Sequence, residues 1–370
     1  MDYRPTRAII DLKAIRENTE KIIAEYNDYE YKIGVIKANC YGFGSEKVIP
    51  ALIEGGINYL AVSCVKEALE AKRICGGKIP IMILVPCEVA AYPLCAREGI
   101  AVSVATLSQA KQVCDIPELK VFIRANGGRD LFGGPTQREA FEEIFDILCG
   151  GSCVLEGIFM HCYNPEDISV TSREYDTFES CIGGIDLSKV KIISTSNSLS
   201  LPIYEKKPYC NAFRIGNMLY GIENTNLGLS ETFKLVSEVK QIITLRRGQS
   251  ISYCGYCARR EGERIALIPI GYGDGFSKAN EGRDIFINKQ RCKIITVTMD
   301  ITLADIGIEE GEVPSQSEKN PSGDMGAAMP SEVILIAGNR HLDEIAKHTG
   351  GVAEEAICAL NGRVKREYTL

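Results

Sequence analysis

The sequence predicts an α/β fold, in which an N-terminal (β/α)8 TIM-type barrel precedes a C-terminal antiparallel β domain. Short, continuous apolar runs alternate with amphipathic helical patterns in the first part of the 370 residues. This rhythm ends near residue 228, and the later runs alternate apolar with polar residues instead. We therefore place the barrel at 1–228 and the β domain at 229–370.

The barrel is predicted from eight apolar runs that are rich in β-branched residues. Continuous apolar strands are typical of a parallel sheet that helices cover on both faces. Amphipathic stretches such as EKVIPALIEGG and CVKEALEAKRI separate the runs. Eight such units favour a closed barrel over a doubly wound sheet. The runs are 31–37, 57–64, 79–85, 100–105, 119–125, 153–160, 190–195 and 211–216.

The C-terminal part has the pattern of antiparallel strands. The segments that begin at Phe233, Glu263 and Asp284 alternate apolar and polar residues around Gly and Asn turns, without intervening helices. Residues 306–331 are polar and rich in Gly, Pro and Ser, which predicts a surface excursion. SEVILIAG then resumes as a strand, and LDEIAKHTG as a short helix that a glycine ends.

Composition and charge exclude several classes of protein. The content of 45% hydrophobic and 25% charged residues is ordinary for a soluble globular protein. The net charge of −7 argues against a nucleic-acid or anionic-membrane partner. No apolar run approaches the roughly 20 residues that span a bilayer. The start, MDYRPTRAIIDLKAI, lacks the apolar core of a secretory signal, so we expect a cytoplasmic protein.

The fifteen cysteines are scattered through apolar runs. In a chain without an export signal, such cysteines act mostly as small buried apolar side chains. Cys254 and Cys257, and likewise Cys149 and Cys153, have the spacing of metal ligands. Neither a second close pair nor a nearby histidine completes a zinc set, so we expect no metal.

Polar side chains follow several of the predicted barrel strands directly. Lys37 and Tyr41 follow the first run, His161 follows GIFM, Ser198 follows KIIST, and Arg214 lies in FRIGNMLYG. Barrel enzymes place their active sites at the carboxyl ends of the strands. These five groups are therefore expected to converge on one rim, although each residue alone also fits an ordinary structural role.

The combination of groups points to a cofactor. A lysine removed from water loses its proton more readily and can form a Schiff base with an aldehyde. Backbone N–H groups in RIGN, with the hydroxyls of Ser198 and Tyr41, could hold a phosphate at a helix start. Arg214 could meet a pyridine nitrogen. Together these are the groups needed to bind pyridoxal 5′-phosphate (PLP).

The motif VIKANCYGFG (35–44) resembles the lysine motif VxKANAYGHG of the alanine racemase family. The resemblance spans almost the whole chain and implies a barrel followed by a β domain, PLP as cofactor, and a head-to-tail homodimer with shared active sites. Further matches follow in the family's order and near its spacing: MHCYNPED, TSNSLS, RIGNMLYG, ISYCGYCA, IPIGYGDGF, VTMD and LNGRVKREY.

On the cofactor side, the resemblance assigns Lys37 to the covalent link and Arg214 to the pyridine nitrogen. An arginine in place of a carboxylate leaves this nitrogen largely unprotonated, which discourages transamination and other side reactions. The cofactor phosphate is expected to be bound by Tyr41, Ser198, Gly216 and Asn217.

For the chemistry at Cα, the resemblance implies two bases on opposite faces of the substrate, Lys37 and Tyr253, with the tyrosine supplied by the other subunit. Tyrosine is normally protonated at neutral pH, so a contact with His161, itself near Arg214, would favour the phenolate. The other subunit's side of the substrate site is expected to be lined by Tyr272, Met299 and Asp300.

The chain departs from the family in the segment IRANGGRDLFGG (123–134). The family commonly has KVDTGMxRLG, in which the lysine can be carbamylated and the arginine contacts the substrate carboxylate. Counting back from Gly133 puts Arg124 at the lysine position and Leu131 at the arginine position. Arg129, displaced by two residues, is the candidate for the substrate carboxylate, and carbamylation is not expected.

A second departure concerns the substrate side chain. Near the C-terminus the family usually has a tyrosine that narrows the pocket, whereas GGVAEEA puts Glu354 there. A carboxylate facing the pocket could accept a hydroxyl or amine from a side chain larger than that of alanine.

The prediction is a PLP-dependent isomerase, an amino-acid racemase that interconverts L- and D-alanine and supplies D-alanine for peptidoglycan. Two alternatives stay open. The first is a racemase that prefers serine or a basic amino acid (lysine, ornithine or arginine). The second is a PLP-binding protein without turnover.

Overall fold

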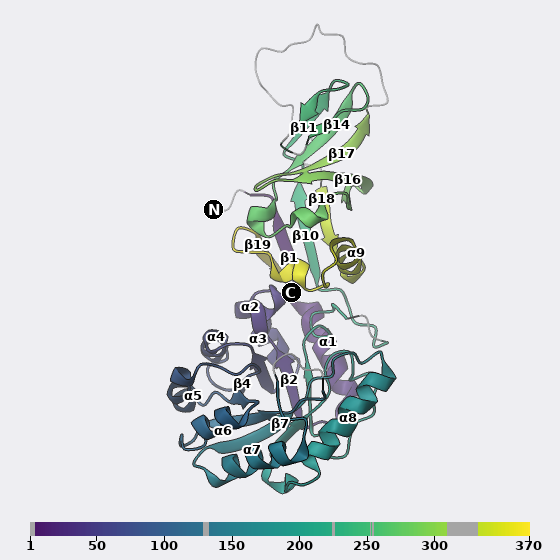
Figure 1. The fold of residues 1–370 in the computed structure, drawn as a ribbon. Coiled ribbons are helices and arrows are strands. Elements are labelled where there is room, and N and C mark those ends of the chain that lie inside the picture. The colour runs from purple at the N-terminus through teal and green to yellow at the C-terminus, as the bar shows by residue number, and fades with distance from the viewer. Residues whose placement is uncertain (1–3, 129–132, 224–225, 252, 254, 309–331) are drawn as a thin grey trace. The chain divides into compact units, whose positions relative to one another are not determined.

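The computed structural model describes residues 4–128, 133–223, 226–251, 253, 255–308 and 332–370. The chain forms two compact units (Figure 1). One unit comprises Leu12–Glu231, and the other comprises Met1–Asp11 together with Thr232–Leu370. Within the described ranges, no helix is long and apolar enough to cross a membrane. The same residues contain no group of three or more His, Cys, Asp or Glu side chains that could hold a metal ion.

The first unit is a barrel of eight parallel strands in the order β4-β3-β2-β9-β8-β7-β6-β5. A parallel bridge between Met82 and Ala101 links β4 to the start of β5 and closes the ring. Each predicted run contains one strand, so the barrel prediction is confirmed. The strands are β2 (Tyr31–Val35), β3 (Tyr59–Val62), β4 (Ile81–Ile83), β5 (Val102–Val104), β6 (Lys120–Arg124), β7 (Val154–Phe159), β8 (Ile192–Ser194) and β9 (Ala212–Ile215).

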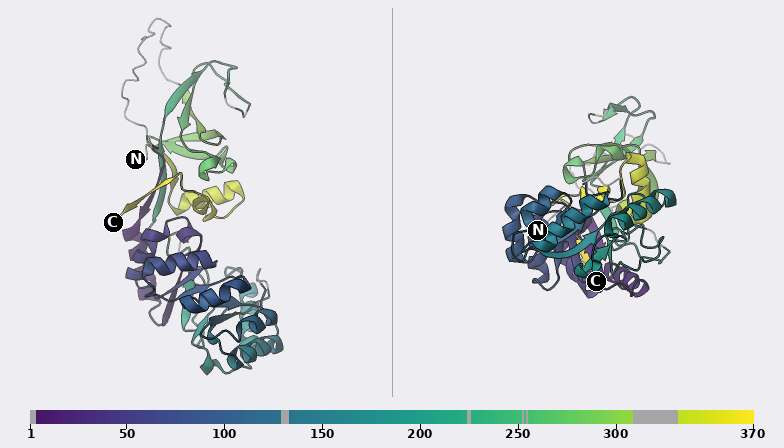
Figure 2. Two further views of the ribbon diagram at one scale, coloured as in Figure 1. Left: turned by 90° about the vertical axis from the view of Figure 1, so that its left-hand side faces the viewer. Right: turned by 60° about the horizontal axis from the view of Figure 1, so that its bottom comes forward.

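Helices cover the outside of the barrel strands (Figures 1 and 2). Local signals explain where several begin. Thr106 and Gln109 form a capping box, and the Asp167 carboxylate accepts N–H groups of the following turn. The helices are α1 (Leu12–Glu25), α2 (Lys37–Tyr41), α3 (Ser45–Glu54), α4 (Val65–Cys75), η1 (Val89–Ala91), α5 (Tyr92–Glu98), α6 (Leu107–Val113), α7 (Arg138–Gly150), α8 (Ile168–Ile182) and η2 (Leu187–Lys189).

The strand register brings the carboxyl ends of β6, β7 and β8 to one level. Arg124 pairs with Phe159, which pairs in turn with Ser194. Paired residues of neighbouring parallel strands point to the same side of the sheet. All three side chains are buried, so they lie together inside the barrel at the end where the predicted site residues follow the strands.

The second unit is built on a nine-stranded sheet in the order β11-β14-β17-β16-β15-β18-β10-β1-β19. Its neighbouring strands are antiparallel except β1 and β19, which confirms the predicted class of this domain. The strands are β1 (Arg7–Asp11), β10 (Phe233–Glu238), β11 (Gln241–Leu245), β14 (Glu263–Ile268), β15 (Asp284–Ile287), β16 (Gln290–Val297), β17 (Thr302–Ile308), β18 (Glu332–Ala337) and β19 (Lys365–Thr369).

Strand β1 lies in the second sheet although it precedes the barrel in sequence. It pairs with β10 and β19, and alternate residues are buried, as in a strand with one face on a core. The remaining elements are β12 (Ser250–Ile251), β13 (Tyr256–Cys257), η3 (Tyr272–Asp274), η4 (Lys278–Asn280), α9 (Asn339–Thr349) and α10 (Glu355–Cys358). The surface excursion predicted at 306–331 lies outside the described residues from 309 onward.

Candidate active site

Lys37 begins the short turn α2, two residues after the end of β2. Its side chain is exposed, and Nζ lies 5.8 Å from the centroid of the Tyr41 ring. The sequence therefore placed this lysine correctly at a strand end. The desolvated setting that we expected for it is absent in the single chain.

The turn that follows Lys37 is left-handed. Ala38, Asn39, Cys40 and Tyr41 have φ between 52° and 56° although none is glycine. This conformation costs roughly 1–2 kcal/mol per residue for L-amino acids. Such strain persists only where the surrounding contacts determine it, and it is typical of functional sites.

Two side chains hold this turn in place. The Glu67 carboxylate accepts the Ala38 N–H at 2.7 Å and the Ser63 N–H at 2.9 Å. The Asn39 side-chain oxygen accepts the Ser45 N–H, also at 2.7 Å. Glu67 lies in α4 and belongs to none of the sequence motifs, so sequence reasoning missed it. Its role is to fix the backbone directly after Lys37.

Tyr41 is packed against the end of β9. Its ring centroid lies 4.9 Å from that of Tyr220, whose hydroxyl donates to the Val35 carbonyl at 2.9 Å. A Cβ added to Gly216 would lie 2.3 Å from the Tyr41 hydroxyl oxygen, closer than any real Cβ contact. The hydroxyl therefore lies directly against the Gly216 backbone, and a side chain at this position would require Tyr41 to move.

Ser198, Gly216 and Asn217 form the adjoining part of the site. The Gly216 N–H donates to the Ser198 hydroxyl oxygen at 3.0 Å. The chain then makes a turn, in which the Leu219 N–H donates to the Gly216 carbonyl at 2.8 Å. We had expected a helix to start here, and that expectation was wrong. Asn217 donates to Glu223 at 3.2 Å, while its buried side-chain oxygen has no hydrogen-bond partner among the described residues.

Arg214 is buried in the mouth of the barrel. Its guanidinium donates to the Met160 carbonyl at 2.9 Å and to the Ser194 hydroxyl at 3.2 Å, and it lies 4.9 Å from the Phe159 ring centroid. One of its nitrogens lies 3.3 Å from Nδ1 of His161. The predicted pairing of His161 with Arg214 is thus present, and the histidine ring is exposed on its other side.

A second guanidinium, that of Arg124, contacts the same aromatic ring. It lies 5.6 Å from the Phe159 centroid and donates to the Leu84 carbonyl at 3.2 Å. In the closed eight-stranded order, β6 is four strands from β2, so Arg124 lies across the barrel from the strand that leads to Lys37. Arg129 and Leu131 lie outside the described residues.

Tyr253 lies at the tip of the hairpin β12–β13 in the second unit, and its side chain is fully exposed, at 101%. The base of this hairpin is anchored by the buried Glu263. The Glu263 carboxylate accepts the Tyr256 hydroxyl at 2.8 Å and the backbone N–H groups of Arg259 and Arg260 at 3.0 and 2.9 Å. The hairpin is thus anchored at Glu263, while Tyr253 at its tip is exposed.

The Glu263 contacts predict a pH-dependent stability. Burial raises the pKa of this carboxyl, but hydrogen bonds from Tyr256 and from the Arg260 and Arg259 backbone outweigh burial, so the pKa lies below its ordinary value of 4.5. The stabilisation is therefore complete above pH 4.5 and is lost as the pH falls through the folded-state pKa. In urea unfolding measured between pH 7 and 3, the free energy of unfolding of Glu263→Gln should fall less steeply with acid than that of the wild type. Parallel curves for the two proteins would contradict this.

The second unit also holds the other expected substrate-side residues. Tyr272, Met299 and Asp300 are exposed and lie on two adjacent loops. Glu354 is half-buried and precedes α10. Its neighbour Glu355, rather than Glu354, lines a cavity of about 230 Å³ between η4, α9 and α10.

The barrel thus brings together one set of the predicted residues, and the second unit holds the other. Lys37 and Tyr41 follow β2, His161 follows β7 and Ser198 follows β8. Arg214 lies within β9, and Gly216 and Asn217 follow it. The Met160 carbonyl and Ser194, which hold Arg214, were missed because neither contact has a sequence signal of its own.

Two family models cover nearly the whole chain. The model described as alanine racemase, N-terminal domain, matches residues 10–224, and the model described as alanine racemase, C-terminal domain, matches residues 232–368.

The chain belongs to the alanine racemase family.

Named members of the alanine racemase family match along their full length. The chain is 31% identical to the alanine racemase of Staphylococcus saprophyticus, over 99% of this chain and 95% of that protein. The solved alanine racemase of Clostridium difficile superposes with a TM-score of 0.86 at 26% identity, covering 99% of this chain and 96% of the other. That of Bacillus anthracis, solved with bound L-Ala-P, has a TM-score of 0.83 at 26% identity, covering 100% and 96%.

Proposed function

We propose that this chain is a PLP-dependent racemase that interconverts L- and D-alanine. The observation that carries the proposal is the barrel rim, where Lys37 follows β2 and a buried arginine, Arg214, holds His161 within 3.3 Å. This rim occurs in a chain that matches the alanine racemase family from residue 10 to residue 368.

The residues at the rim fit PLP. A phosphate needs hydroxyl and N–H donors in a place that a backbone can approach closely. Tyr41, Ser198 and the turn at Gly216–Asn217 provide both, since the Tyr41 hydroxyl lies directly against the bare Cα of Gly216. Lys37 would hold the cofactor covalently, and Arg214 would face its pyridine nitrogen. When bound, the cofactor withdraws electrons from the substrate and so makes the α-proton removable.

The fit predicts that Gly216→Ala weakens PLP binding. The new Cβ would lie 2.3 Å from the Tyr41 hydroxyl oxygen and 2.9 Å from its Cζ, so the tyrosine must move out of the phosphate site. We expect PLP affinity to fall by about tenfold or more, since the loss of one charge-assisted hydrogen bond is of that size. Absorbance titration of apoprotein with PLP measures it. Gly150→Ala is the control, because a Cβ there meets nothing within 4 Å; equal affinities for both variants would contradict the prediction.

Racemisation requires a proton to leave one face of Cα and another to arrive at the opposite face. Two bases on opposite sides achieve this without turning the substrate. Lys37 serves one face, and Tyr253 of the partner subunit serves the other. The exposed hairpin tip that carries Tyr253 suits a residue that reaches into another chain. His161, oriented by Arg214, would donate the hydrogen bond that favours the phenolate.

We further propose a cytoplasmic homodimer whose D-alanine feeds peptidoglycan synthesis. The described cysteines form no disulfide bonds with one another, as a reducing compartment favours. For the substrate carboxylate, Arg129 remains the candidate from the sequence. Besides Arg214, the buried guanidinium of Arg124 lies inside the rim.

The test is α-proton exchange in D2O, followed by NMR with PLP-loaded protein and alanine, serine, lysine, ornithine and arginine in turn. Exchange with inversion of alanine is the expected result. Exchange confined to serine or a basic amino acid would keep the two bases and change the substrate, with Glu354 as the first residue to replace. No exchange with any of the five amino acids would overturn the racemase proposal in favour of a PLP-binding protein without turnover.

A further inference from the structure

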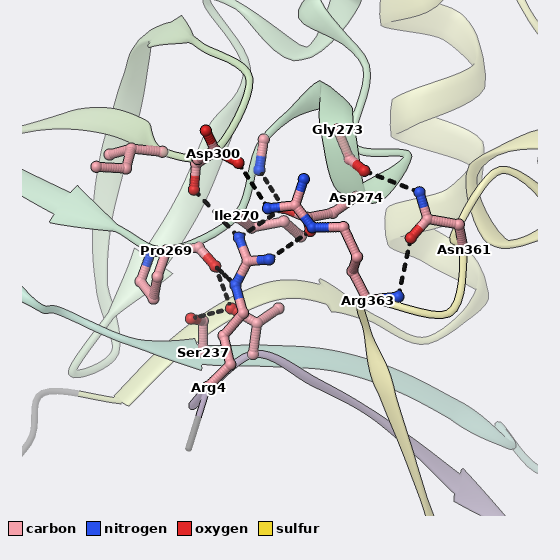
Figure 3. A network of polar contacts seen from close by, with 12 residues as sticks. Arg4, Ser237, Pro269, Ile270, Gly273, Asp274, Asp300, Asn361 and Arg363 are labelled. Atoms are coloured by element: carbon pink, nitrogen blue, oxygen red, sulfur yellow. Dashed lines mark hydrogen bonds and ion pairs between the residues drawn. The ribbon is translucent and has the colours of Figure 1, made fainter. Parts of the chain in front are cut away.

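The carboxylate of Asp274 is completely buried, at 0% exposure, in the second unit. It accepts two hydrogen bonds from Arg4, at 2.6 and 2.8 Å, and Nε of Arg363 lies 3.1 Å from it (Figure 3). Arg4 precedes β1 and Arg363 precedes β19, so the two arginines come from opposite ends of the chain. A buried charge is costly unless it is paired, and this carboxylate is paired twice.

The same ionic groups bind two loops to each other. The second oxygen of Asp274 accepts the Gly271 N–H at 2.8 Å, in the loop 271–275. Arg363 donates to the Asp300 carboxylate at 2.6 Å, and Arg4 donates to the Asp300 carbonyl at 3.2 Å, in the loop 298–301. Figure 3 shows both guanidinium groups between these loops.

Backbone hydrogen bonds complete the connection between the loops. The Tyr272 N–H donates to the Thr298 carbonyl at 3.0 Å, and the Gly273 N–H donates to the Met299 carbonyl at 2.9 Å. The approach is so close that a Cβ on Gly271 would lie 2.2 Å from the Thr298 oxygen. The ionic groups and the backbone hydrogen bonds thus join the two loops to each other.

The side chains on the outer side of these loops are exposed. Tyr272 is 46% and Met299 is 53% exposed, and the Asp300 side chain, although bound to Arg363, is 58% exposed. A buried ionic cluster thus fixes the relative positions of three accessible side chains. Two of them are an aromatic ring and a thioether, groups that a protein usually keeps from water.

We propose that Asp274 is the positioning residue of the substrate site, holding Tyr272 and the Met299–Asp300 pair in the arrangement that meets the substrate. The inference rests on the proposed function, in which these three side chains line the other subunit's site. Asp274 itself contacts neither substrate nor cofactor. It acts by neutralising Arg4 and Arg363 so that both can stay between the loops.

Asp274→Asn tests this with little change of shape. The amide has no charge, so Arg4 and Arg363 lose the buried anion that they share, and one oxygen must serve both Gly271 and the guanidinium groups. We expect KM for alanine to rise by about tenfold or more while kcat changes by less than about threefold, because binding geometry and not proton transfer is disturbed. The N–H groups of Gly271, Tyr272 and Gly273 should exchange faster with deuterium.

Asp284→Asn is the matched control. Asp284 begins β15 in the sheet of the second unit and pairs with two cations, Arg291 at 2.6 Å and Lys293 at 3.6 Å, and its contacts among the described residues include neither loop. It should leave KM and the exchange of 271–273 unchanged. Arg363→Lys is the second variant should Asp274→Asn fold poorly. It keeps the charge but cannot bridge Asp274 and Asp300, so a smaller KM increase with faster exchange is expected.

The outcomes separate this inference from the proposed function. An active wild-type protein whose Asp274→Asn and Arg363→Lys variants keep the wild-type KM would overturn the inference alone, and Asp274 would then be purely structural. Equal KM increases in Asp274→Asn and Asp284→Asn would overturn it as well, because the effect would not depend on the loops. A wild-type protein that turns over no amino acid would overturn the proposed function and this inference with it.

Discussion

Tyr253→Phe is expected to lower the rate of alanine racemisation by about 10²–10⁴-fold, the usual contribution of a general acid or base. The ring and the hairpin stay, since Glu263 anchors the hairpin through Tyr256 and not through Tyr253. PLP absorbance and affinity should remain as in the wild type. Because Lys37 is unaffected, one enantiomer of alanine should still exchange its α-proton with D2O without inversion, while the other should not.

Tyr209→Phe is the control for the loss of a tyrosine hydroxyl. Its hydroxyl donates to Glu179 at 3.0 Å, a contact with α8 on the outside of the barrel. This variant should racemise alanine at the wild-type rate. Full activity of Tyr253→Phe, or equal loss of exchange from both enantiomers, would contradict the two-base assignment.

Lys37→Ala is expected to abolish racemisation, with a loss of more than about 10⁴-fold, because both the covalent anchor and one base disappear. The protein should also lose PLP on gel filtration. After borohydride reduction, mass spectrometry should find the cofactor on Lys37 in the wild type and nowhere in the variant. The left-handed turn begins at the next residue and is held by Glu67, so the fold should be unaffected.

Lys47→Ala, at an exposed position of α3, controls for the removal of a lysine. It should keep both the covalent cofactor and the activity. Covalent PLP on another lysine in Lys37→Ala would refute the assigned anchor.

Hydrophobic patterning was sufficient to predict the fold class. All eight apolar runs contain a barrel strand, because a strand buried on both faces is mainly apolar along its length. The alternating segments after residue 228 form the antiparallel sheet. A strand with one buried and one accessible face alternates apolar and polar residues. The place of β1 was not predictable in this way. Its partners β10 and β19 are more than 200 residues away, so its pairing has no local signal.

Motifs predicted the candidate site only as far as residue identity goes. The family is confirmed by the two domain matches. The roles assigned to Lys37, Tyr253 and Arg214 stay predictions. Contacts made by residues outside the motifs were not foreseeable. Such residues support the site through their position in the fold, and no sequence pattern marks them. Glu67 and Ser194 are examples.

Local pattern and motifs along the chain were sufficient to predict the fold class of each domain, the family and the side chains of the proposed chemistry. How those side chains are held became visible in the folded chain. The left-handed turn after Lys37, the close approach of Tyr41 to Gly216 and the burial of Asp274 between Arg4 and Arg363 each join segments distant in sequence or override local preference. Such features are decided by packing and charge pairing, which exist only once the chain has folded.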